Sequence, residues 1–273
     1  MSFPFADVAE VQVRDLLSLA GRRALVTGGA RGLGKAIALR LAEAGADVAI
    51  ADIDHELARA AASDIARRFA VKAVGVPMDV TDAASVRAAT DSVIEDLAGL
   101  DLWINNAGVF PSIPVLETED AAWESVFAVN ARGVFNGSRE AARRMAPGGS
   151  GVIVNIVSTA GFQGTAPGLS AYVGSKHAVR GMTKQMALEF APLGIRVLGV
   201  APTFVPTEGN MAAGAAAMEA AGVDPATVPV MNHSLIGRLG TPDDIARVVL
   251  FCASDMSMIM TGSTLLADAG QTI

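Results

Sequence analysis

The amino-acid sequence predicts a doubly wound α/β fold, in which helices cover both faces of a seven-stranded parallel sheet. Short apolar runs alternate with longer helical patterns from residue 23 to residue 267, as expected of strands that are buried on both faces. Apolar residues form 51% of the 273-residue chain and glycine occurs 28 times, which suits a large core crossed by tight turns. Because no internal repeat or low-complexity linker divides the chain, we expect one domain over residues 21–273.

The expected elements follow one another as βαβ units with right-handed crossovers. The apolar runs predict strands at Ala24–Thr27, Val48–Ala51, Ala73–Val76, Leu102–Asn105, Val152–Val157, Ile195–Val200 and Thr264–Ala267. The longer patterns predict helices at Leu33–Ala44, His55–Arg68, Ala83–Leu97, Ala121–Met145, Ala171–Ala191 and Pro242–Ala253. Two helix starts carry capping signals, since Thr81-Asp82 precedes one helix and Thr241 precedes Pro242 in another.

Two segments depart from this alternation. Residues 1–20 have an apolar pattern that fits a short amphipathic arm or an unstructured terminus. Residues 203–240 contain several prolines and the run MAAGAAAME without a clear strand. A long insertion of this kind in a compact domain is usually functional or mobile.

Composition argues against several kinds of partner. The formal net charge of −7, without a basic stripe, argues against nucleic acid. No apolar stretch reaches the roughly 20 residues of a membrane span, and the first residues lack a secretory signal, so we expect a cytoplasmic protein. Cys252 is the only cysteine and lies in an apolar helical pattern, which predicts a buried, inert thiol. The three scattered histidines, His55, His177 and His233, predict no metal site.

Glycines gather where the first expected strand meets the first expected helix, in the run Gly28-Gly29-Ala30-Arg31-Gly32-Leu33-Gly34. Taken alone, such a cluster is as consistent with a tight turn as with a ligand site. At this position, however, glycines let the backbone approach a pyrophosphate, and the helix N-terminus offers unpaired N–H groups. We therefore expect a dinucleotide to bind at the loop residues Gly28, Arg31, Gly32, Leu33 and Gly34.

The second strand bears on which dinucleotide is bound. It ends at Asp52, where a carboxylate accepts hydrogen bonds from the adenosine ribose and repels a 2′-phosphate, so the sequence favours NAD over NADP. Arg31 is the opposing signal, because a guanidinium in the glycine loop suits a 2′-phosphate. An exposed arginine paired with a nearby acid is the alternative interpretation of Arg31.

Two further turns lie at the carboxyl ends of strands, where ligands bind in such sheets. Asp79 and Val80 close the third strand, and the Asp79 carboxylate is a candidate partner for the adenine amino group. Asn106, Ala107 and Gly108 follow the fourth strand and are small enough for close backbone contact with a cofactor. Each motif alone is consistent with an ordinary turn.

Taken together, the order TGGARGLG, Asp52, NNAG, Asn130, Ser158 and Tyr172-Val173-Gly174-Ser175-Lys176 resembles the short-chain dehydrogenase/reductase family in its compact form. The resemblance spans nearly the whole chain and includes that family's glycine spacing, Gly28-xxx-Gly32-x-Gly34. It implies a Rossmann-type fold, a nicotinamide cofactor and an alcohol or carbonyl substrate. It also implies that the catalytic residues are Ser158, Tyr172, Lys176 and Asn130, with Tyr172 and Lys176 also contacting the cofactor.

The residue types suit that chemistry. Tyr172 and Lys176 are one helical turn apart, so both side chains lie on one helix face. A lysine ammonium favours a phenolate, so we expect it to lower the pKa of Tyr172 and make Tyr172 a general base or acid. Ser158 is suited to hydrogen-bond the substrate oxygen. The resemblance assigns Asn130 to a water-mediated proton relay from the lysine.

The chain departs from the family after the sixth strand, where Thr203 stands in place of a usual glycine. Since threonine lacks glycine's access to positive φ, we expect a reshaped turn there. The rest of the pattern matches, and the resemblance assigns the backbone of Val205 to the nicotinamide carboxamide and Thr207 to the carboxamide or pyrophosphate. At the C-terminus, Ala269 also replaces a usual glycine, and the family likeness implies a homotetramer, with a dimer as the second choice.

The resemblance places residues 203–240, Phe110, Phe162 and Leu169 around the pocket mouth. We therefore expect residues 203–240, the expected substrate loop, to determine substrate identity together with these three side chains. These residues are apolar, and Met211, Met218 and Met231 either line an adaptable pocket or pack within the loop. We expect a hydrophobic secondary alcohol or ketone. The alternatives are an NADP-dependent carbonyl reductase of biosynthesis and a nucleotide-binding scaffold without turnover, the latter disfavoured by the intact catalytic set.

Overall fold

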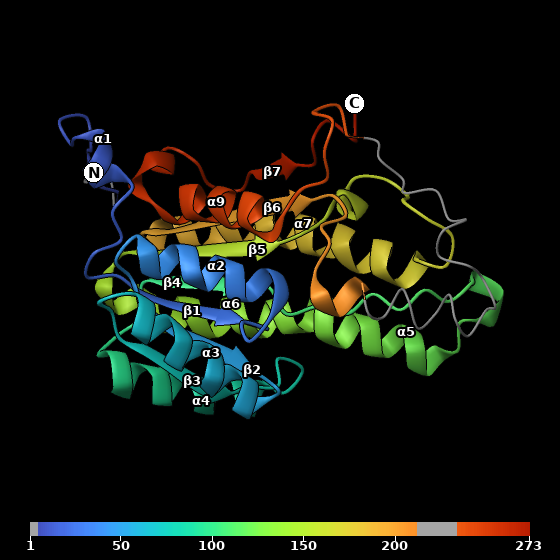
Figure 1. The fold of residues 1–273 in the computed structure, drawn as a ribbon, viewed down its shortest axis with the longest axis horizontal. Coiled ribbons are helices and arrows are strands. Elements are labelled where there is room, and N and C mark those ends of the chain that lie inside the picture. Colours follow the sequence, from blue (N-terminus) through green and yellow to red (C-terminus); the bar gives the residue numbers. More distant parts are fainter. Residues whose placement is uncertain (1–4, 212–233) are drawn as a thin grey trace.

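The computed structural model describes residues 5–211 and 234–273, and in these ranges it contains one seven-stranded sheet (Figure 1). All six strand pairings are parallel, as the alternating pattern predicts, and the strand order is β3-β2-β1-β4-β5-β6-β7. The strands are β1 (Arg23–Thr27), β2 (Asp47–Asp52), β3 (Ala73–Pro77), β4 (Leu102–Asn105), β5 (Gly151–Ile156), β6 (Ile195–Pro202) and β7 (Thr264–Ala267).

Helices cover both faces of this sheet (Figure 1). One face packs against α2 (Gly32–Glu43), α3 (His55–Arg68) and α9 (Pro242–Ala253). The other packs against α4 (Ala83–Leu97), α6 (Gly133–Met145) and α7 (Ser170–Phe190). Successive strand residues alternate between the two cores, and the central strands β4, β5 and β6 are buried along their whole length. Burial on both faces explains why these strands are almost continuously apolar.

The strand order determines where a ligand can bind. The chain runs from β1 outward through β2 to β3, and then returns to place β4 on the other side of β1. The loops that leave β1 and β4 therefore diverge at the carboxyl edge of the sheet and open a crevice between them. The glycine run follows β1 and Asn106-Ala107-Gly108 follows β4, so both candidate cofactor motifs lie at this crevice.

The helix expected over Ala121–Met145 is not continuous. It comprises α5 (Asp120–Phe127), a π-helical turn η2 (Ala128–Arg132) and α6. Asn130 lies inside the π turn and is completely buried. Its side chain exchanges two hydrogen bonds with the backbone of Val109, at 2.8 Å each, and such tertiary bonds hold the backbone away from the regular pattern.

The two segments that depart from the alternation, residues 1–20 and 203–240, are each described in part. Residues 5–20 include one helical turn, α1 (Val13–Leu16), and end with the buried Leu19. Residues 212–233, which include most of the expected substrate loop and its Met218 and Met231, lie outside the described residues. Among the helices described, none is long and apolar enough to cross a membrane.

Two non-glycine residues of the described chain, Ala98 and Ala269, have positive φ, at 61° and 55°. Ala98 ends α4 in the left-handed conformation that glycine adopts without steric cost. We expect Ala98→Gly to raise the free energy of unfolding by about 1 kcal/mol. The matched control is Ala88→Gly, an exposed position inside α4, which should lower the same quantity by about 1 kcal/mol. Urea unfolding of both variants checks the opposite signs.

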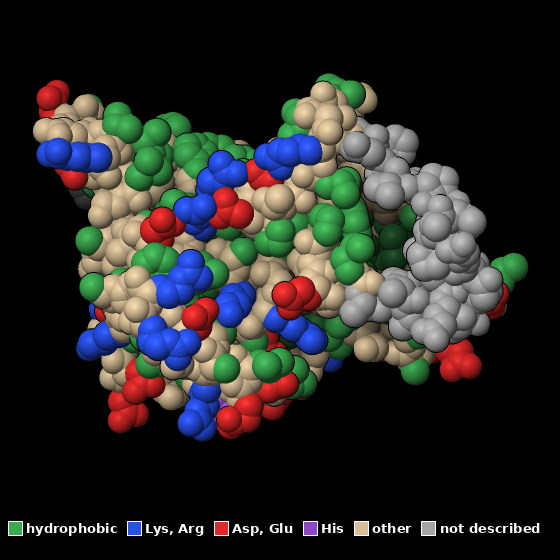
Figure 2. All heavy atoms as spheres, in the orientation of Figure 1, with side chains coloured by type: hydrophobic (Ala, Val, Ile, Leu, Met, Phe, Trp, Pro, Cys, Tyr) green, Lys and Arg blue, Asp and Glu red, His purple; other side chains and the backbone are tan. Residues whose placement is uncertain are grey.

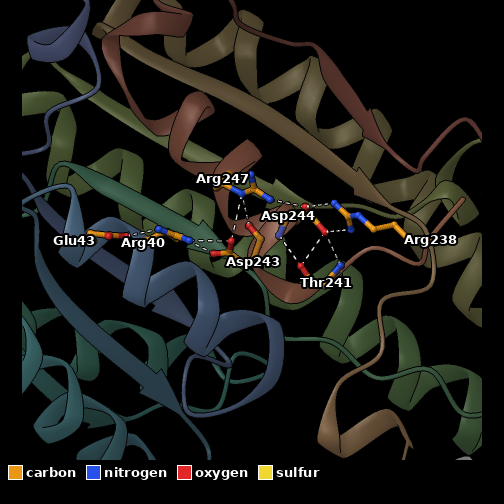
Figure 3. A network of polar contacts seen from close by, with 7 residues as sticks. All are labelled: Arg40, Glu43, Arg238, Thr241, Asp243, Asp244 and Arg247. Carbon is orange, nitrogen blue, oxygen red and sulfur yellow. Dashed lines mark hydrogen bonds and ion pairs between the residues drawn. The ribbon is translucent and has the colours of Figure 1, made fainter. Parts of the chain in front are cut away.

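A chain of alternating charges joins α2, α9 and Arg238, which precedes α9 in the sequence (Figure 3). Asp243 accepts two bonds from Arg40, and Asp244 accepts two bonds from Arg238, at 2.5 and 2.8 Å. Arg247 bridges the two acids. Figure 2 shows acidic and basic side chains interspersed over this face of the molecule. The network ties Arg238 to the start of α9.

Asp244 also belongs to a capping box, because its carboxylate accepts from the backbone N of Thr241 while the Thr241 hydroxyl accepts from the Asp244 N. We expect Asp244→Ala to lower the free energy of unfolding by about 1 to 2 kcal/mol at pH 7. The Arg238 guanidinium holds the pKa of the Asp244 carboxyl well below its usual range. The loss in free energy of unfolding caused by Asp244→Ala should therefore be largest above about pH 4 and shrink as the pH falls further.

Urea unfolding from pH 7 down to pH 3 measures that difference. Glu56→Ala is the control, since Glu56 is an exposed carboxylate of α3 whose contact with Arg59 is long, at 3.4 Å. An Asp244→Ala variant that matches this control at pH 7 would contradict the capping role.

Candidate active site

The glycine loop forms a cradle against which a dinucleotide phosphate fits. Gly28 and Gly32 have φ values of 60° and 54°, so these turns need glycine. A Cβ at Gly34 would clash with the carbonyl of Gly28 and lie 2.6 Å from Nδ2 of Asn106. Since α2 begins at Gly32, the loop also presents the unpaired N–H groups of a helix N-terminus. Leu33 is half-buried against the core, whereas Arg31 is exposed.

Asp52 lies beside this cradle, at the end of β2. Its carboxylate accepts from the backbone N of Ala30 in the glycine loop and from the backbone N of Asp54, at 3.2 Å each. The acid is half-buried and therefore joins the loop to the strand end while part of it faces solvent. This placement suits a carboxylate that meets the ribose of a bound adenosine.

Asp79 and Val80 follow β3, which ends at Pro77, one residue beyond the predicted strand. Oδ1 of Asp79 accepts from both the backbone N and the hydroxyl of Thr81, at 2.9 and 2.7 Å. The side chain of Val80 is buried beneath Gly133, where an added Cβ would lie 2.8 Å from it. Within the described residues, Oδ2 of Asp79 accepts no hydrogen bond, so one oxygen remains for a ligand amino group.

The turn after β4 braces the cradle. Nδ2 of Asn106 donates to the carbonyls of Thr27 and Gly28, at 2.9 and 3.0 Å, and the backbone N of Ala107 donates to the Thr27 hydroxyl. Both hydrogen bonds of the Asn106 Nδ2 are thus made with the loop. Gly108 lies beside Asn130 and Lys176. A Cβ at Gly108 would be 3.3 Å from Oδ1 of Asn130 and 3.8 Å from Nζ of Lys176.

Ser158, Tyr172 and Lys176 come together at the carboxyl end of β5. Ser158 follows that strand and hydrogen-bonds the hydroxyl of Tyr172, which projects from the first turn of α7. Lys176 lies one turn further along α7 and is buried, with Nζ donating to the carbonyl of Ile156 at 2.8 Å and lying 5.6 Å from the Tyr172 ring centre. The three residues selected from the sequence are therefore neighbours in space.

The predicted lowering of the Tyr172 pKa by Lys176 is wrong. Burial raises the pKa of the Tyr172 hydroxyl above its ordinary value, and the hydrogen bond with Ser158 offsets part of that rise. Burial also lowers the pKa of Lys176 to about 8. The ammonium is directed to a backbone carbonyl, so desolvation outweighs the charge effect that the helical spacing suggested.

Asn130 joins this group through a residue that the sequence reasoning missed. Its Nδ2 donates to the hydroxyl of Ser175 at 3.1 Å, and that hydroxyl donates to the carbonyl of Tyr172 at 2.7 Å. Ser175 is completely buried. Its place one turn from Tyr172 on the same helix was the available signal. The π turn is thereby tied to the part of α7 that carries Tyr172.

The turn after β6 carries the two remaining candidates. Val205 is buried, and Thr207 packs against the glycine loop, because a Cβ at Gly32 would lie 3.4 Å from Cβ of Thr207. Thr203 is not among the residues with positive φ, so the turn is not strained there. Its hydroxyl instead donates to the side chain of Gln271, a bond that a glycine would not make.

Of the apolar residues expected around the pocket mouth, Phe110 contacts Tyr172. The ring of Phe110 meets the Tyr172 ring edge-on at 6.0 Å between centres and is half exposed, as is Phe204. Phe162 is covered by the guanidinium of Arg180, 3.8 Å from its centre. Leu169 directly precedes α7. The loops that carry Phe110 and Leu169 are joined by a hydrogen bond from the Ile113 N to the Gly168 carbonyl, at 2.9 Å.

Comparisons with known proteins agree with this arrangement. A family model described as enoyl-(acyl carrier protein) reductase matches residues 28–272. The chain is 35% identical to 3-oxoacyl-[acyl-carrier-protein] reductase FabG of Aquifex aeolicus, over 93% of this chain and 98% of the relative. It is 36% identical to cyclopentanol dehydrogenase of Comamonas sp., over 91% and 96% of the two chains.

A solved structure of a short-chain type dehydrogenase/reductase from Mycobacterium marinum superposes with a TM-score of 0.85 at 35% identity, covering 96% of this chain and 99% of that one. Fold, family model and relatives agree along nearly the whole length. The chain therefore belongs to the short-chain dehydrogenase/reductase family and is an oxidoreductase of that family.

Proposed function

We propose that this chain is an NAD(H)-dependent enzyme that interconverts a hydrophobic secondary alcohol and its ketone. The observation that carries the proposal is the meeting of Tyr172, Ser158 and Lys176 beside the glycine cradle. One group of side chains suited to proton transfer thus lies at the crevice that accepts a dinucleotide. When bound, a nicotinamide cofactor supplies the hydride acceptor for alcohol oxidation and the hydride donor for ketone reduction.

In this proposal the chain's own residues handle the proton. Tyr172 removes the hydroxyl proton of an alcohol, or donates a proton to a carbonyl oxygen in the reverse direction. Ser158 hydrogen-bonds the same substrate oxygen and stabilises the charge that develops on it. Lys176 and Asn130 hold the part of α7 that carries Tyr172, through the Ile156 carbonyl and through Ser175, and Lys176 would be one of the residues that hold the cofactor. The cradle, Asp52, Asp79 and the turn at Val205 and Thr207 hold the cofactor.

The preference for NAD rests on Asp52. We expect Asp52→Asn, which keeps an acceptor for the Ala30 N, to raise the NADP to NAD ratio of kcat/KM at least about tenfold, because a charge repulsion is removed. Asp54→Asn is the control, since asparagine also caps helices well and α3 begins there. Steady-state kinetics with both cofactors measure the ratio. An unchanged ratio would mean that Asp52 does not face the ribose.

The edge-on contact of Phe110 with Tyr172, together with the apolar types of Phe162, Leu169 and Phe204, supports a hydrophobic substrate without an anionic group. A screen of aromatic, alicyclic and steroid-like alcohols and ketones with both cofactors, followed by nicotinamide absorbance, tests substrate and cofactor together. We expect turnover of cyclic or aromatic compounds. A strong preference for a phosphorylated or dicarboxylate substrate would overturn the substrate proposal.

Two alternatives give different outcomes in that screen. NADP-dependent carbonyl reduction is favoured by the exposed Arg31 and by the similarity to a 3-oxoacyl-[acyl-carrier-protein] reductase, and it predicts turnover with NADPH. A nucleotide-binding scaffold predicts cofactor binding without turnover. The expected homotetramer, cytoplasmic location and single domain over residues 21–273 stay predictions, and light scattering of the purified chain measures the first.

A further inference from the structure

Ser158 opens a short helical turn, η4 (Thr159–Gly161), that leads away from the end of β5. The Ser158 hydroxyl accepts from the backbone N of Ala160 at 3.1 Å and also hydrogen-bonds Tyr172. The Ser158 carbonyl accepts from the Gly161 N at 2.9 Å. Because these bonds join the first residue of the turn to the residues that follow, a displacement of Gly161 also displaces the Ser158 hydroxyl.

The far end of this turn is held by Arg180 of α7. Arg180 lies one helical turn beyond Lys176 and two beyond Tyr172, so the three side chains project from neighbouring parts of one helix face. Its Nη1 donates to the Gly161 carbonyl at 3.3 Å, and its Cζ lies 3.8 Å from the centre of the Phe162 ring. The guanidinium thus clamps the end of the turn to the helix that carries Tyr172.

The turn and α7 are also in direct backbone contact, since a Cβ at Gly161 would lie 2.9 Å from the carbonyl oxygen of Lys176. Arg180 adds a side-chain clamp to that contact. Within residues 5–211 and 234–273, the half-buried Arg180 forms no ion pair with an acid. Its planar group lies instead on an aromatic ring, a contact that arginine makes and lysine does not reproduce.

We propose that Arg180 is a positioning residue, which sets the place of the Ser158 hydroxyl relative to that of Tyr172 by clamping the end of η4 to α7. The inference rests on the proposed function, in which Ser158 and Tyr172 act on the same substrate oxygen. A hydrogen-bond donor that is slightly misplaced stabilises the developing charge less well, so loosening the clamp lowers kcat. Arg180 acts through the turn and not through its charge.

Two variants separate the clamp from the charge. Arg180→Lys keeps the charge but loses the planar face and the fork that reaches Gly161, and Arg180→Met removes the charge as well. We expect kcat for the best alcohol of the screen to fall about tenfold in both variants. The NADH dissociation constant, which also reports that each variant is folded, should stay within about twofold. A wild-type kcat in Arg180→Lys beside a reduced kcat in Arg180→Met would overturn the clamp in favour of the charge.

A double-mutant cycle with Ser158→Ala identifies the residue through which Arg180 acts. Without the Ser158 hydroxyl its position no longer matters, so Arg180→Lys should lower the remaining kcat by less than about twofold. Single turnovers with the enzyme in excess keep the slow rate of Ser158→Ala measurable. An equal fall in both backgrounds would overturn the proposal, because Arg180 would then act on Tyr172 or on the fold as a whole.

Arg139→Lys is the matched control. The Arg139 guanidinium also lies over an aromatic ring, 4.8 Å from the centre of Phe135, but on α6. It should leave kcat within about twofold in the wild-type and in the Ser158→Ala background, which shows what the loss of an arginine–aromatic contact does elsewhere.

The outcomes separate this proposal from the one on which it rests. Turnover by the wild type together with a failed cycle would overturn the clamp alone. A wild-type chain that turns over no alcohol or ketone of the screen with either cofactor would overturn the proposed function and the clamp with it.

Discussion

Replacing Tyr172 with phenylalanine is expected to lower kcat about a thousandfold, because the hydroxyl that transfers the proton is lost. The affinity for NADH should change less than about tenfold, since at most one cofactor hydrogen bond is removed. The half-buried ring and its edge-on contact with Phe110 need no hydroxyl, so the fold is retained. Initial rates with the best alcohol of the screen, together with NADH titration, measure the two effects.

His177→Ala is the control for that experiment. Histidine is the side chain whose ordinary pKa is nearest neutrality, and His177 directly follows Lys176. However, it is exposed, and its Nδ1 lies 3.0 Å from the carbonyl of Val173 on its own helix. We expect its rate to stay within a factor of about two of the wild type. A Tyr172→Phe variant that keeps a tenth or more of the wild-type rate would refute the proton-transfer role.

Replacing Lys176 with methionine is expected to lower kcat about a hundredfold or more and, at pH 7, to make the protein more stable. The folded chain holds Lys176 at a pKa of about 8, below the ordinary lysine value of about 10.4. At neutral pH the folded state therefore bears the cost of a buried charge, about 3 kcal/mol for a shift of this size. Losing the hydrogen bond to Ile156 offsets about 1 to 2 kcal/mol of the gain.

The pH dependence has a definite sign. Between pH 8 and about 10.4 the folded wild type binds fewer protons than the unfolded chain, so its stability rises with pH across that window. The advantage of Lys176→Met should therefore be largest at pH 7 and absent near pH 10.5. Urea unfolding at both pH values measures it, with Lys184→Met as the control, because Lys184 is exposed on the same helix. An equal advantage at both pH values would mean that the lysine charge is not the cause.

The sheet was predictable because its strands are buried on both faces. Such strands must be almost continuously apolar, and this leaves a signal in the sequence that needs no knowledge of neighbours. The π turn at Asn130 leaves no such signal. It depends on the loop at Val109, which is distant in the sequence, and a regular helical pattern continues through it.

In the candidate site, too, some features could be predicted from the sequence and others could not. The positions of Tyr172 and Lys176 follow from helix spacing, and the glycine cradle follows from strand-to-helix order, so both could be identified in advance. The direction in which the Tyr172 pKa shifts could not be identified in advance, because it depends on how much water reaches the hydroxyl. Arg180 was missed although it continues the four-residue spacing of Tyr172 and Lys176 along α7, a pattern that the sequence does contain.

Tyr172 is the only tyrosine of the chain, and this gives the enzyme a built-in optical reporter. Phenolate absorbs in the near ultraviolet where phenol does not, so an absorbance titration of the unlabelled protein follows the ionisation of one group at one site. Burial and the Ser158 hydrogen bond, which act in opposite directions on that ionisation, become separable by titrating the wild type and Ser158→Ala side by side. The residue proposed to move the proton thus reports its own protonation, without labels and without turnover.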